Sequence, residues 1–381
     1  MTTVYDLLVV GAGPAGSACA RRAGELGLRC LALERSSFPR EKPCAGGLTW
    51  GAFSGLDPGA RAVLHNEIAS VEIDFGGAAG LLWRAREPVI ITTTRREFDS
   101  HLVERAVAAG AGFEFGVQAT AVAAGNDAVT VRAGGREWSG RYLVAADGAD
   151  GVIRRLACLP PLTQFGAAYV RAFPPTASAL ESLREAVVFD LSAAPRGYGW
   201  VFPKRDHLNV GVYTQRPLGR GLLELLEQFV STRDLSGWRL EGPLAGRAPA
   251  RSRGARVAAG RILFAGDAAG LVDPITGEGI SHALASGAEA ADAVHQSLEA
   301  GESAEEVYAR SIRTRVLPAV DRLTPIGSFV HAVGPRVSGR VVTSPVALAL
   351  VARFGPWSAE GLAGGELLVR RASEWHPARL V

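Results

Sequence analysis

The stretch Val4–Glu34, VYDLLVVGAGPAGSACARRAGELGLRCLALE, predicts a strand, a tight turn, a helix and a second strand. Leu7–Val10 form a continuous apolar run, which is typical of a strand buried on both faces of a parallel sheet. Gly11, Gly13 and Gly16 follow this strand directly and open an alanine-rich helix. This order of elements is typical of a unit that binds a dinucleotide.

Each glycine of the turn has its own mechanical task. The first permits the tight turn, the second lets backbone approach a pyrophosphate, and the third lets helix and strand pack closely. The helix start supplies unpaired N–H groups and a partial positive charge for the phosphates. Glu34 follows Gly16 by 18 residues and ends the second strand, where a carboxylate can accept hydrogen bonds from both ribose hydroxyls. Arg35 either supports the adenosine or is an ordinary solvated arginine.

Length and composition restrict the class of protein. A chain of 381 residues favours two domains, or one large α/β unit with insertions. Apolar residues make up 48% and charged residues 21%, which indicates a globular rather than a disordered chain. The net charge of +3 is spread without basic blocks, so we expect no nucleic-acid partner.

The four cysteines, Cys19, Cys30, Cys44 and Cys158, show neither a CxxC pair nor metal-ligand spacing. The chain also enters its first strand without a signal sequence, so we expect reduced thiols in a cytoplasmic protein, without disulfides or a metal site. No apolar run reaches the roughly 18 to 20 residues that a membrane span needs. The run SPVALALVARFG, from Ser344, predicts a buried helix, with contact to a membrane surface as the alternative.

A second segment, GRILFAGDAAGLVDPITGEGISHALASGAEAADAV from Gly260, adds a strand, a loop and a long helix. Asp267 follows the strand Ile262–Ala265 and is expected at the carboxyl edge of the sheet, where ligands bind. Its short side chain can hydrogen-bond a ribityl hydroxyl. Gly277 and Gly279 precede the helix, whose N–H groups can face the pyrimidine edge of a flavin.

Two further patterns lie between these segments. RYLVAADGADGVIRR, from Arg141, predicts a strand that ends at Asp147-Gly148. TTTRREFDSHL, from Thr92, predicts an amphipathic helix that begins near Arg95. Each pattern alone is ordinary, since an Asp-Gly pair after a strand is common turn chemistry. Their order after the glycine turn favours a flavin over a nicotinamide cofactor.

The order GxGxxG…E, RxxFDxxL, DG and GDAAGxxxPxxGEG resembles the flavoprotein family of p-hydroxybenzoate hydroxylase, from Val4 to about Val294. EKPCAGGL and YGWVFP are similar to the KPCGG and YxWxFP motifs of the geranylgeranyl reductase group, although Ala45 replaces a glycine. The resemblance implies an α/β fold: a Rossmann-type FAD-binding domain, an inserted mainly antiparallel β-sheet substrate domain and a C-terminal helical region.

The resemblance also implies the cofactor and the reaction. The FAD-binding residues would be Gly11, Gly13, Ala15, Gly16, Glu34, Arg35, Cys44, Arg95, Asp267, Gly277, Gly279 and Ile280. The group reduces carbon–carbon double bonds of prenyl chains, with hydride passing from flavin N5 to one alkene carbon and a proton reaching the other. The implied electron donor is transient NAD(P)H or reduced ferredoxin, and the implied partner is a prenylated small molecule or lipid.

The segment RGYGWVFPKRDHLNVGVY, from Arg196, predicts a hairpin whose first strand ends at Pro203. Tyr198, Trp200 and Phe202 alternate along that strand and therefore share one face. An aromatic wall of this kind suits an isoprenoid chain, although it can also be ordinary sheet core. We interpret the three residues as substrate-binding.

The candidate catalytic residues are Cys44, Tyr198 and Trp200. The proton can come from reduced flavin, ordered water, Tyr198 or Cys44. A buried thiol is often only a small hydrophobe, so Cys44 is either a participant or a packing residue. With a flavin present, the glycines after Cys44 permit its loop to lie close to the isoalloxazine ring.

The predicted FAD-binding domain comprises residues 1–65, 92–158 and 253–300. The substrate domain comprises residues 66–91 and 159–252 and is expected to roof the flavin. Residues 301–381 are expected to form a helical cap, which begins with a capping box at Ser303 and Glu306.

Two other functions remain open. One is a flavin-dependent monooxygenase or halogenase on the same fold. Halogenases carry WxWxIP and a lysine near the substrate, whereas this chain has YGWVFP and a lysine, Lys42, in the loop before Cys44. The other is a flavin-bearing prenyl-lipid binding protein without turnover. The sequence leaves the particular substrate, the electron donor, the proton donor and the oligomeric state undecided.

Overall fold

The computed structural model describes residues 4–76, 79–162, 164–181, 183–215, 221–233, 235, 237–249, 255–273, 276–321 and 366–371. The chain forms two compact units. Unit 1 comprises Met1–Glu41, Arg95–Gln164 and Ala248–Arg322, and unit 2 comprises Lys42–Thr94, Phe165–Arg247 and Leu323–Val381. Residues 42–65, which were predicted to lie in the FAD-binding domain, thus fall in unit 2. Residues 301–322, which were predicted to lie in the helical cap, fall in unit 1. The functional domain division predicted above stays a prediction.

Unit 1 is built on a sheet whose parallel core was predicted from the first motif. Its strands run in the order β18 (Ile262–Phe264), β11 (Arg136–Ala145), β1 (Val4–Val10), β2 (Cys30–Glu34) and β8 (Gly112–Phe115). Each neighbouring pair in this series is parallel. The short strands β9 (Ala121–Ala124), β10 (Val129–Ala133) and β17 (Ala258–Ala259) join it in antiparallel fashion. The carboxyl ends of these five parallel strands, β18, β11, β1, β2 and β8, therefore lie at one edge of the sheet.

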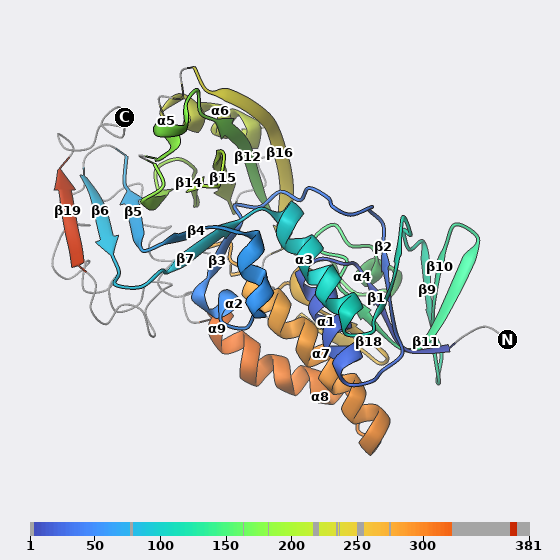
Figure 1. The fold of residues 1–381 in the computed structure, drawn as a ribbon. Coiled ribbons are helices and arrows are strands. Elements are labelled where there is room, and N and C mark those ends of the chain that lie inside the picture. Colours follow the sequence, from blue (N-terminus) through green and yellow to red (C-terminus); the bar gives the residue numbers. More distant parts are fainter. Residues whose placement is uncertain are drawn as a thin grey trace. The chain divides into compact units, whose positions relative to one another are not determined.

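Helix α1 (Pro14–Glu25) contacts both α3 (Arg95–Ala108) and α7 (Ile280–Ala300), and Figure 1 shows these helices as a group. Gly287 allows the close approach of α7 to α1, because a Cβ at this position would lie 2.1 Å from the Ala15 carbonyl oxygen. Two short helices follow strands of the sheet: α4 (Ile153–Leu156) after β11 and the 3₁₀ turn η2 (Gly266–Ala269) after β18.

Helical structure continues after Gly301, as predicted, through α8 (Ala304–Ser311), the π-helical turn η3 (Ile312–Val316) and α9 (Leu317–Asp321). The Ser303 hydroxyl accepts a hydrogen bond from the Glu306 backbone N–H at 3.4 Å, which is half of the predicted capping box. Tyr308 in α8 is fully buried and donates to the Phe264 carbonyl oxygen at 2.6 Å. This bond fixes α8 against β18.

Unit 2 contains a large sheet with the order β16 (Arg239–Pro249), β12 (Gln164–Phe173), β15 (Leu208–Thr214), β14 (Gly197–Pro203), β13 (Ala186–Asp190), β5 (Ser70–Asp74), β6 (Ala79–Arg84) and β19 (Glu366–Arg371). Pairing is antiparallel from β12 through β13 and again from β5 to β19, whereas β13 and β5 are parallel. The mainly antiparallel sheet is thus as predicted.

The strand β19 departs from the helical C-terminus that the sequence predicted. It extends the sheet by pairing with β6, with Leu368 opposite Leu82. The segment contains the apolar run Leu367–Val369, which suits a short strand at the edge of a sheet. The run from Ser344 lies outside the described residues.

The predicted hairpin is confirmed: Tyr198 in β14 pairs with Tyr213 in β15, and Pro203 pairs with Leu208. The turn closes with a hydrogen bond from Lys204 N to the His207 carbonyl oxygen at 2.7 Å. Helix α6 (Gly221–Ser231) packs on one face of this sheet. A Cβ on Gly199 would lie 2.5 Å from the Phe229 ring of α6, so α6 sits directly on β14.

A smaller sheet of β3 (Gly47–Thr49), β7 (Ile90–Thr93) and β4 (Leu64–Ile68) also belongs to unit 2. The short helices α2 (Trp50–Phe53), η1 (Pro58–Val63) and α5 (Ala177–Glu181) complete the unit. β3 follows the Cys44 loop immediately, so this sheet anchors one end of the loop.

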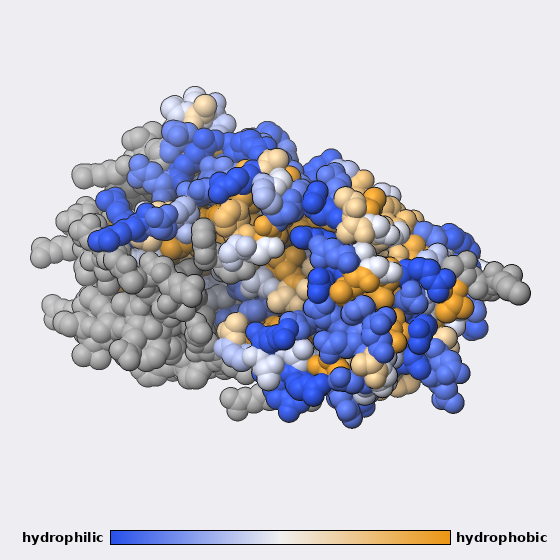
Figure 2. All heavy atoms as spheres, turned by 60° about the horizontal axis from the view of Figure 1, so that its bottom comes forward, coloured by the Kyte–Doolittle hydropathy of each residue, from blue (hydrophilic) through white to orange (hydrophobic). Residues whose placement is uncertain are grey.

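Within the described residues, no helix is both long and apolar enough to cross a membrane. The face drawn in Figure 2 shows apolar patches interrupted by hydrophilic side chains. Among the residues that the structure describes, the large apolar side chains that are exposed lie apart in the sequence: Val4, Val107, Phe115, Leu223 and Leu240.

Candidate functional site

The glycine turn of unit 1 is held by backbone packing that excludes side chains. Gly11 has a φ of +103°, and a Cβ here would lie 2.3 Å from the Ala146 carbonyl oxygen. A Cβ on Gly16 would lie 1.8 Å from the Gly11 carbonyl oxygen. Only glycine fits at either position, because these neighbours are backbone atoms that cannot move aside.

Glu34 lies at the carboxyl end of β2, is only 5% exposed, and is oriented by two backbone donors. Its Oε2 accepts from Ala12 N at 2.7 Å, and its Oε1 accepts from Ser36 N at 2.9 Å. A carboxylate oxygen can accept more than one hydrogen bond, so both retain capacity for ribose hydroxyls. The carboxylate is therefore fixed where the sequence predicted a ribose contact.

Arg35 takes a different position from its neighbour. Its side chain is exposed, and its charge acts on Asp147 at the end of β11. Burial raises the pKa of Asp147, while the Ile153 backbone N–H at 2.9 Å, in the first turn of α4, opposes that shift. Asp147 therefore serves the start of a short helix, and Arg35 stays a predicted cofactor contact.

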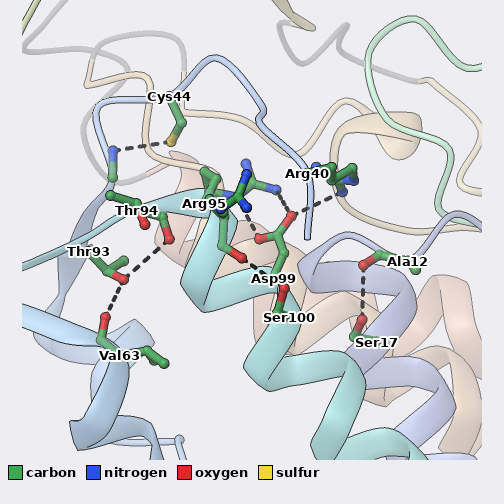
Figure 3. Close-up of polar contacts among 12 residues, drawn as sticks. Ala12, Ser17, Arg40, Cys44, Val63, Thr93, Thr94, Arg95, Asp99 and Ser100 are labelled. Carbon is green, nitrogen blue, oxygen red and sulfur yellow. Dashed lines mark hydrogen bonds and ion pairs between the residues drawn. The ribbon is translucent and has the colours of Figure 1, made fainter. Parts of the chain in front are cut away.

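Two arginines converge on one aspartate near the start of α1 (Figure 3). Arg95 donates from Nε and Nη2 to Asp99, with both distances 2.7 Å, and Arg40 Nη2 lies 3.0 Å from Asp99 Oδ2. A Cβ on Gly13 would lie 3.5 Å from Arg40 Nη2 and 3.8 Å from Arg95 Nη2. The cluster carries a net positive charge beside the helix N-terminus, which suits an anion.

Sequence reasoning predicted Arg95 and missed Arg40. Arg40 stands shortly after the second strand, in a stretch with no strand or helix pattern. Only the folded chain brings it to Gly13. The signal that could have identified Arg40 is its positive charge, because a pyrophosphate site benefits from a second cation beside the glycine turn.

The predicted residues of the second motif also come together. A Cβ on Gly279 would lie 3.5 Å from Asp267 Oδ1, so the aspartate in η2 lies beside the start of α7. Gly277 has a φ of +68° and donates to the Asp273 carbonyl oxygen at 3.0 Å. Ile280 is the first residue of α7 and is buried. Ala15 lies in the same region, since its Cβ would be 3.0 Å from a Cβ on Gly266.

These residues fit FAD. The glycine turn, with its two guanidinium groups, suits the pyrophosphate, and Glu34 suits the adenosine ribose. Asp267 and the N-terminus of α7 lie beyond the adjoining strand ends, where a ribityl chain and a flavin ring have polar groups to satisfy. All of these residues belong to unit 1.

The aromatic face predicted in unit 2 lies on the side of β14 opposite α6. The ring centroids of Tyr198 and Trp200 are 6.3 Å apart. Phe189 of β13 bridges the row, 5.5 Å from Tyr198 and 5.4 Å from Phe202. Tyr213 of β15 lies 5.4 Å from Tyr198. Together these five rings form what we call the aromatic face.

Phe189 and Tyr213 were missed by sequence reasoning, although each occupies a paired position. Phe189 is opposite Trp200, and Tyr213 is opposite Tyr198. Directly opposite residues of antiparallel strands lie on the same side of a sheet. Once the hairpin was predicted, this register could have identified Tyr213.

The Cys44 loop, residues 42–46, is fastened to this part of unit 2 by side-chain hydrogen bonds. Asn209 Nδ2 donates to the Cys44 carbonyl oxygen at 3.0 Å, and Asn209 Oδ1 accepts from Trp200 Nε1 at 2.7 Å. Gly46 N donates to Cys44 Sγ at 3.3 Å (Figure 3). A Cβ on Gly47 would lie 2.4 Å from the Phe202 ring, so the chain passes in contact with the aromatic face.

Lys204 is a further residue of this region that sequence reasoning did not select. Its Nζ donates to the carbonyl oxygens of Ala45 at 2.7 Å and Gly46 at 2.9 Å. Ala45, where the resembled motif has glycine, therefore takes part through its backbone. The available clue was composition, because Lys204 is one of two lysines in the chain and follows YGWVFP directly.

The other cysteines have different surroundings. Cys19 and Cys30 are buried, and burial raises the pKa of Cys30 to about 12. Cys158 is exposed, and Cys44 is half-buried. The described residues contain no group of three or more His, Cys, Asp or Glu side chains placed to hold a metal ion.

The fold and the site of unit 1 define a flavin-binding oxidoreductase with a p-hydroxybenzoate hydroxylase-like architecture. The family model described as FAD binding domain matches residues 4–221, which is more than half of the chain. The chain belongs to this FAD-binding family and, within it, to the geranylgeranyl reductase family. It is an FAD-dependent oxidoreductase.

Two curated relatives are similar over most of the chain. A menaquinone reductase of Mycobacterium tuberculosis is 32% identical over 311 residues, covering 75% of this chain and 76% of the relative. A digeranylgeranylglycerophospholipid reductase of Methanocella arvoryzae is 29% identical over 335 residues, covering 81% of this chain and 82% of the relative.

Solved structures share the fold. A geranylgeranyl bacteriochlorophyll reductase-like protein of Thermoplasma acidophilum matches with a TM-score of 0.75 and 24% identity, covering 93% of this chain and 98% of that one. The flavin-dependent brominase Bmp2 matches with a TM-score of 0.71 and 19% identity, covering 99% and 97%. At these identities both similarities concern the fold alone.

Proposed function

We propose that this protein reduces carbon–carbon double bonds in the prenyl chain of an isoprenoid lipid or prenylated quinone. When bound, FAD would supply hydride to the alkene. The relatives named as reductases of a prenyl lipid and of menaquinone support this substrate class. The test described below uses both kinds of substrate and distinguishes between them.

The observation that carries the proposal is the aromatic face with the Cys44 loop tied to it. Tyr198, Trp200 and Phe202 are each less than 10% exposed in the structure. Their rings form an apolar wall, and the Cys44 loop is tied to it through Asn209, which bonds both the Trp200 indole and the Cys44 carbonyl oxygen. A long apolar chain needs such a surface to leave water, and an isolated alkene must be held tightly to react.

We assign separate tasks to the residues of the chain. The aromatic face binds the prenyl chain and excludes water from it. Trp200 is held in place by its hydrogen bond to Asn209 and so keeps the wall rigid. Cys44 and Tyr198 are the candidate proton donors, since a thiol or a phenol can deliver the proton that alkene reduction requires.

The electron donor and the partners are also proposals. We propose transient NAD(P)H or reduced ferredoxin as the donor, because the one dinucleotide motif in the sequence is assigned to FAD. A prenylated lipid substrate would bring the protein to a membrane surface from the cytoplasm. Reduction of bound flavin by NADPH or by reduced ferredoxin, followed by absorbance, distinguishes the two donors.

Halogenation is the second candidate because the brominase shares the fold. The described lysines give it less support than prenyl reduction. Lys204 is buried and occupied with two carbonyl oxygens, and Lys42 lies two residues before Cys44. A halogenase or monooxygenase needs oxygen, whereas a reductase does not.

The test is a comparison of substrates with and without oxygen. The FAD-loaded protein is reduced by dithionite and mixed with a geranylgeranyl lipid or with menaquinol, whose ring is already reduced, and the products are analysed by mass spectrometry. Anaerobic gain of two hydrogens per double bond supports the proposal. Oxygen-dependent hydroxylation, or halogenation when halide is present, with no anaerobic product would overturn it.

A further inference from the structure

Lys204 is an unusual lysine because it is only 1% exposed. It follows β14 directly and begins the turn to β15. A lysine is rarely buried so completely unless it has partners, since removing an ammonium group from water is costly. Its surroundings should therefore show what the side chain is for.

The partners of Lys204 are the two carbonyl oxygens that follow Cys44. Its Nζ donates to Ala45 at 2.7 Å and to Gly46 at 2.9 Å. Gly46 has a φ of +64°, and a Cβ there would lie 2.2 Å from the Thr93 carbonyl oxygen and 3.0 Å from Nζ. The same Gly46 donates its N–H to Cys44 Sγ at 3.3 Å. The lysine thus holds the turn on which the sulfur is oriented.

We propose that Lys204 is the positioning residue for Cys44: its side chain holds the backbone turn after Cys44, on which the sulfur is oriented. The role in catalysis rests on the proposed prenyl reduction, whereas the coupling of the two side chains does not. Lys204 also joins the loop to the aromatic face, because its Nζ lies 5.8 Å from the centre of the Phe202 ring.

The charge of Lys204 changes near neutral pH. Burial lowers its pKa to about 7, and the charge interaction with Cys44 opposes that shift. The neighbouring titratable or charged groups are Cys44 in the loop, His207, Asp206 and Arg205 in the same turn, His65 in β4, which accepts from Arg205 N, and Arg171 in β12, which acts on His207.

His207 lies in the same turn as Lys204, and its own pKa is also shifted. Burial lowers the pKa of His207, and its hydrogen bond with Asp206 at 2.7 Å opposes the shift. His207 therefore loses its proton before Lys204 does as the pH rises. Above about pH 7 the ammonium is lost, and with it the positive charge that Lys204 places beside the Cys44 loop.

The coupling is tested by the rate at which iodoacetamide alkylates Cys44, measured by mass spectrometry between pH 6 and 9. The exposed thiol of Cys158 in unit 1 is an internal control in the same sample. In the wild type, we expect the Cys44 rate to rise less steeply above pH 7 than the Cys158 rate. In Lys204→Met we expect this difference in slope above pH 7 to disappear. In Arg205→Gln, which removes a charge from the same turn, we expect it to remain.

A variant that fails to fold does not leave the proposal untested. The protein contains only two lysines, so selective ¹³C labelling of lysine gives two side-chain signals. Lys42→Arg identifies the remaining signal as Lys204. Titration of that signal near pH 7, with the midpoint lowered further in Cys44→Ala because the opposing interaction with Cys44 is removed, supports the coupling. Titration near the ordinary lysine range, or no response to Cys44→Ala, would overturn it.

The catalytic role has its own readout. In Lys204→Met we expect kcat for prenyl reduction to fall about tenfold with little change in KM, because the substrate wall is intact but the sulfur is misplaced. The dependence of kcat on pH near 7 should be absent from Lys204→Met. It should also be absent from Lys204→Arg, although that variant should recover part of the rate. If alkylation shows coupling but no prenyl substrate is reduced, the proposed function fails alone. If reduction occurs and Lys204→Met matches the wild type in rate and pH profile, the assignment of Lys204 fails alone.

Discussion

The glycine turn of unit 1 and the Cys44 loop of unit 2 place functional groups by opposite means. In the glycine turn, backbone atoms of neighbouring elements touch, and a Cβ on Gly16 would lie 1.8 Å from a carbonyl oxygen. The Cys44 loop instead depends on two long side chains, Asn209 and Lys204, that reach its carbonyl oxygens. We therefore expect substitutions in the first region to abolish flavin binding and those in the second to alter turnover and its pH dependence.

The largest effect is expected from Gly16→Ala. The added methyl group cannot fit against the Gly11 carbonyl oxygen, so the turn must open and the pyrophosphate site is lost. The purified variant should carry almost no flavin, measured as the ratio of flavin to protein absorbance. Gly125→Ala is the control, because its Cβ would meet only Ala128 O at 3.5 Å. Equal flavin content in both variants would contradict the proposed site.

Gly211→Ala tests the second region of the comparison, the Cys44 loop of unit 2 and the aromatic face to which it is tied. A Cβ here would lie 2.2 Å from the Trp200 ring, so the indole must move and disturb its bond to Asn209. We expect normal flavin content but prenyl turnover lowered by about tenfold or more. Gly55→Ala, at an open position in unit 2, should behave as the wild type. If Gly211→Ala lost its flavin but kept normal turnover for each flavin that remained bound, the assignment of this region to turnover would be contradicted.

The burial of Lys204 predicts a dependence of stability on pH. Above pH 7 the folded protein loses this proton, whereas the unfolded chain keeps it until its ordinary pKa of 10.5. The unfolded state then binds more protons, so stability rises with pH across this window. Urea unfolding of the wild type relative to Lys204→Met should show a gain of about 2 kcal/mol between pH 7 and 9. A constant difference between the two proteins would contradict the buried ammonium.

A smaller effect is expected from Arg40→Gln. Arg95 keeps its paired bonds to Asp99, so one of the two cations beside Gly13 remains. The dissociation constant of FAD, measured by fluorescence titration, should rise by about tenfold, or roughly 1.4 kcal/mol. Arg132→Gln, which removes an exposed ion pair with Glu137, should leave it unchanged. An unchanged constant in Arg40→Gln would remove this residue from the site.

The same contrast explains which residues of the site could be predicted from the sequence and which could not. The glycine turn, Glu34 and Asp267 sit at fixed offsets from regular strands, so spacing alone places them on one sheet edge. Lys204 and Arg40 have no such periodicity, and each acquires its partners only when segments distant in sequence fold together. Phe189 was also missed, because nothing in the sequence fixes the register of its strand against Trp200.

The central claim is tested most directly by anaerobic stopped-flow of the reduced, FAD-loaded protein against a geranylgeranyl lipid and against menaquinol, whose ring is already reduced and cannot accept the electrons. We predict that flavin absorbance returns on mixing with a prenylated substrate and that the prenyl chain of the product gains two hydrogens for each flavin reoxidised. Flavin that stays reduced until oxygen is admitted, with every prenyl double bond intact, would contradict it.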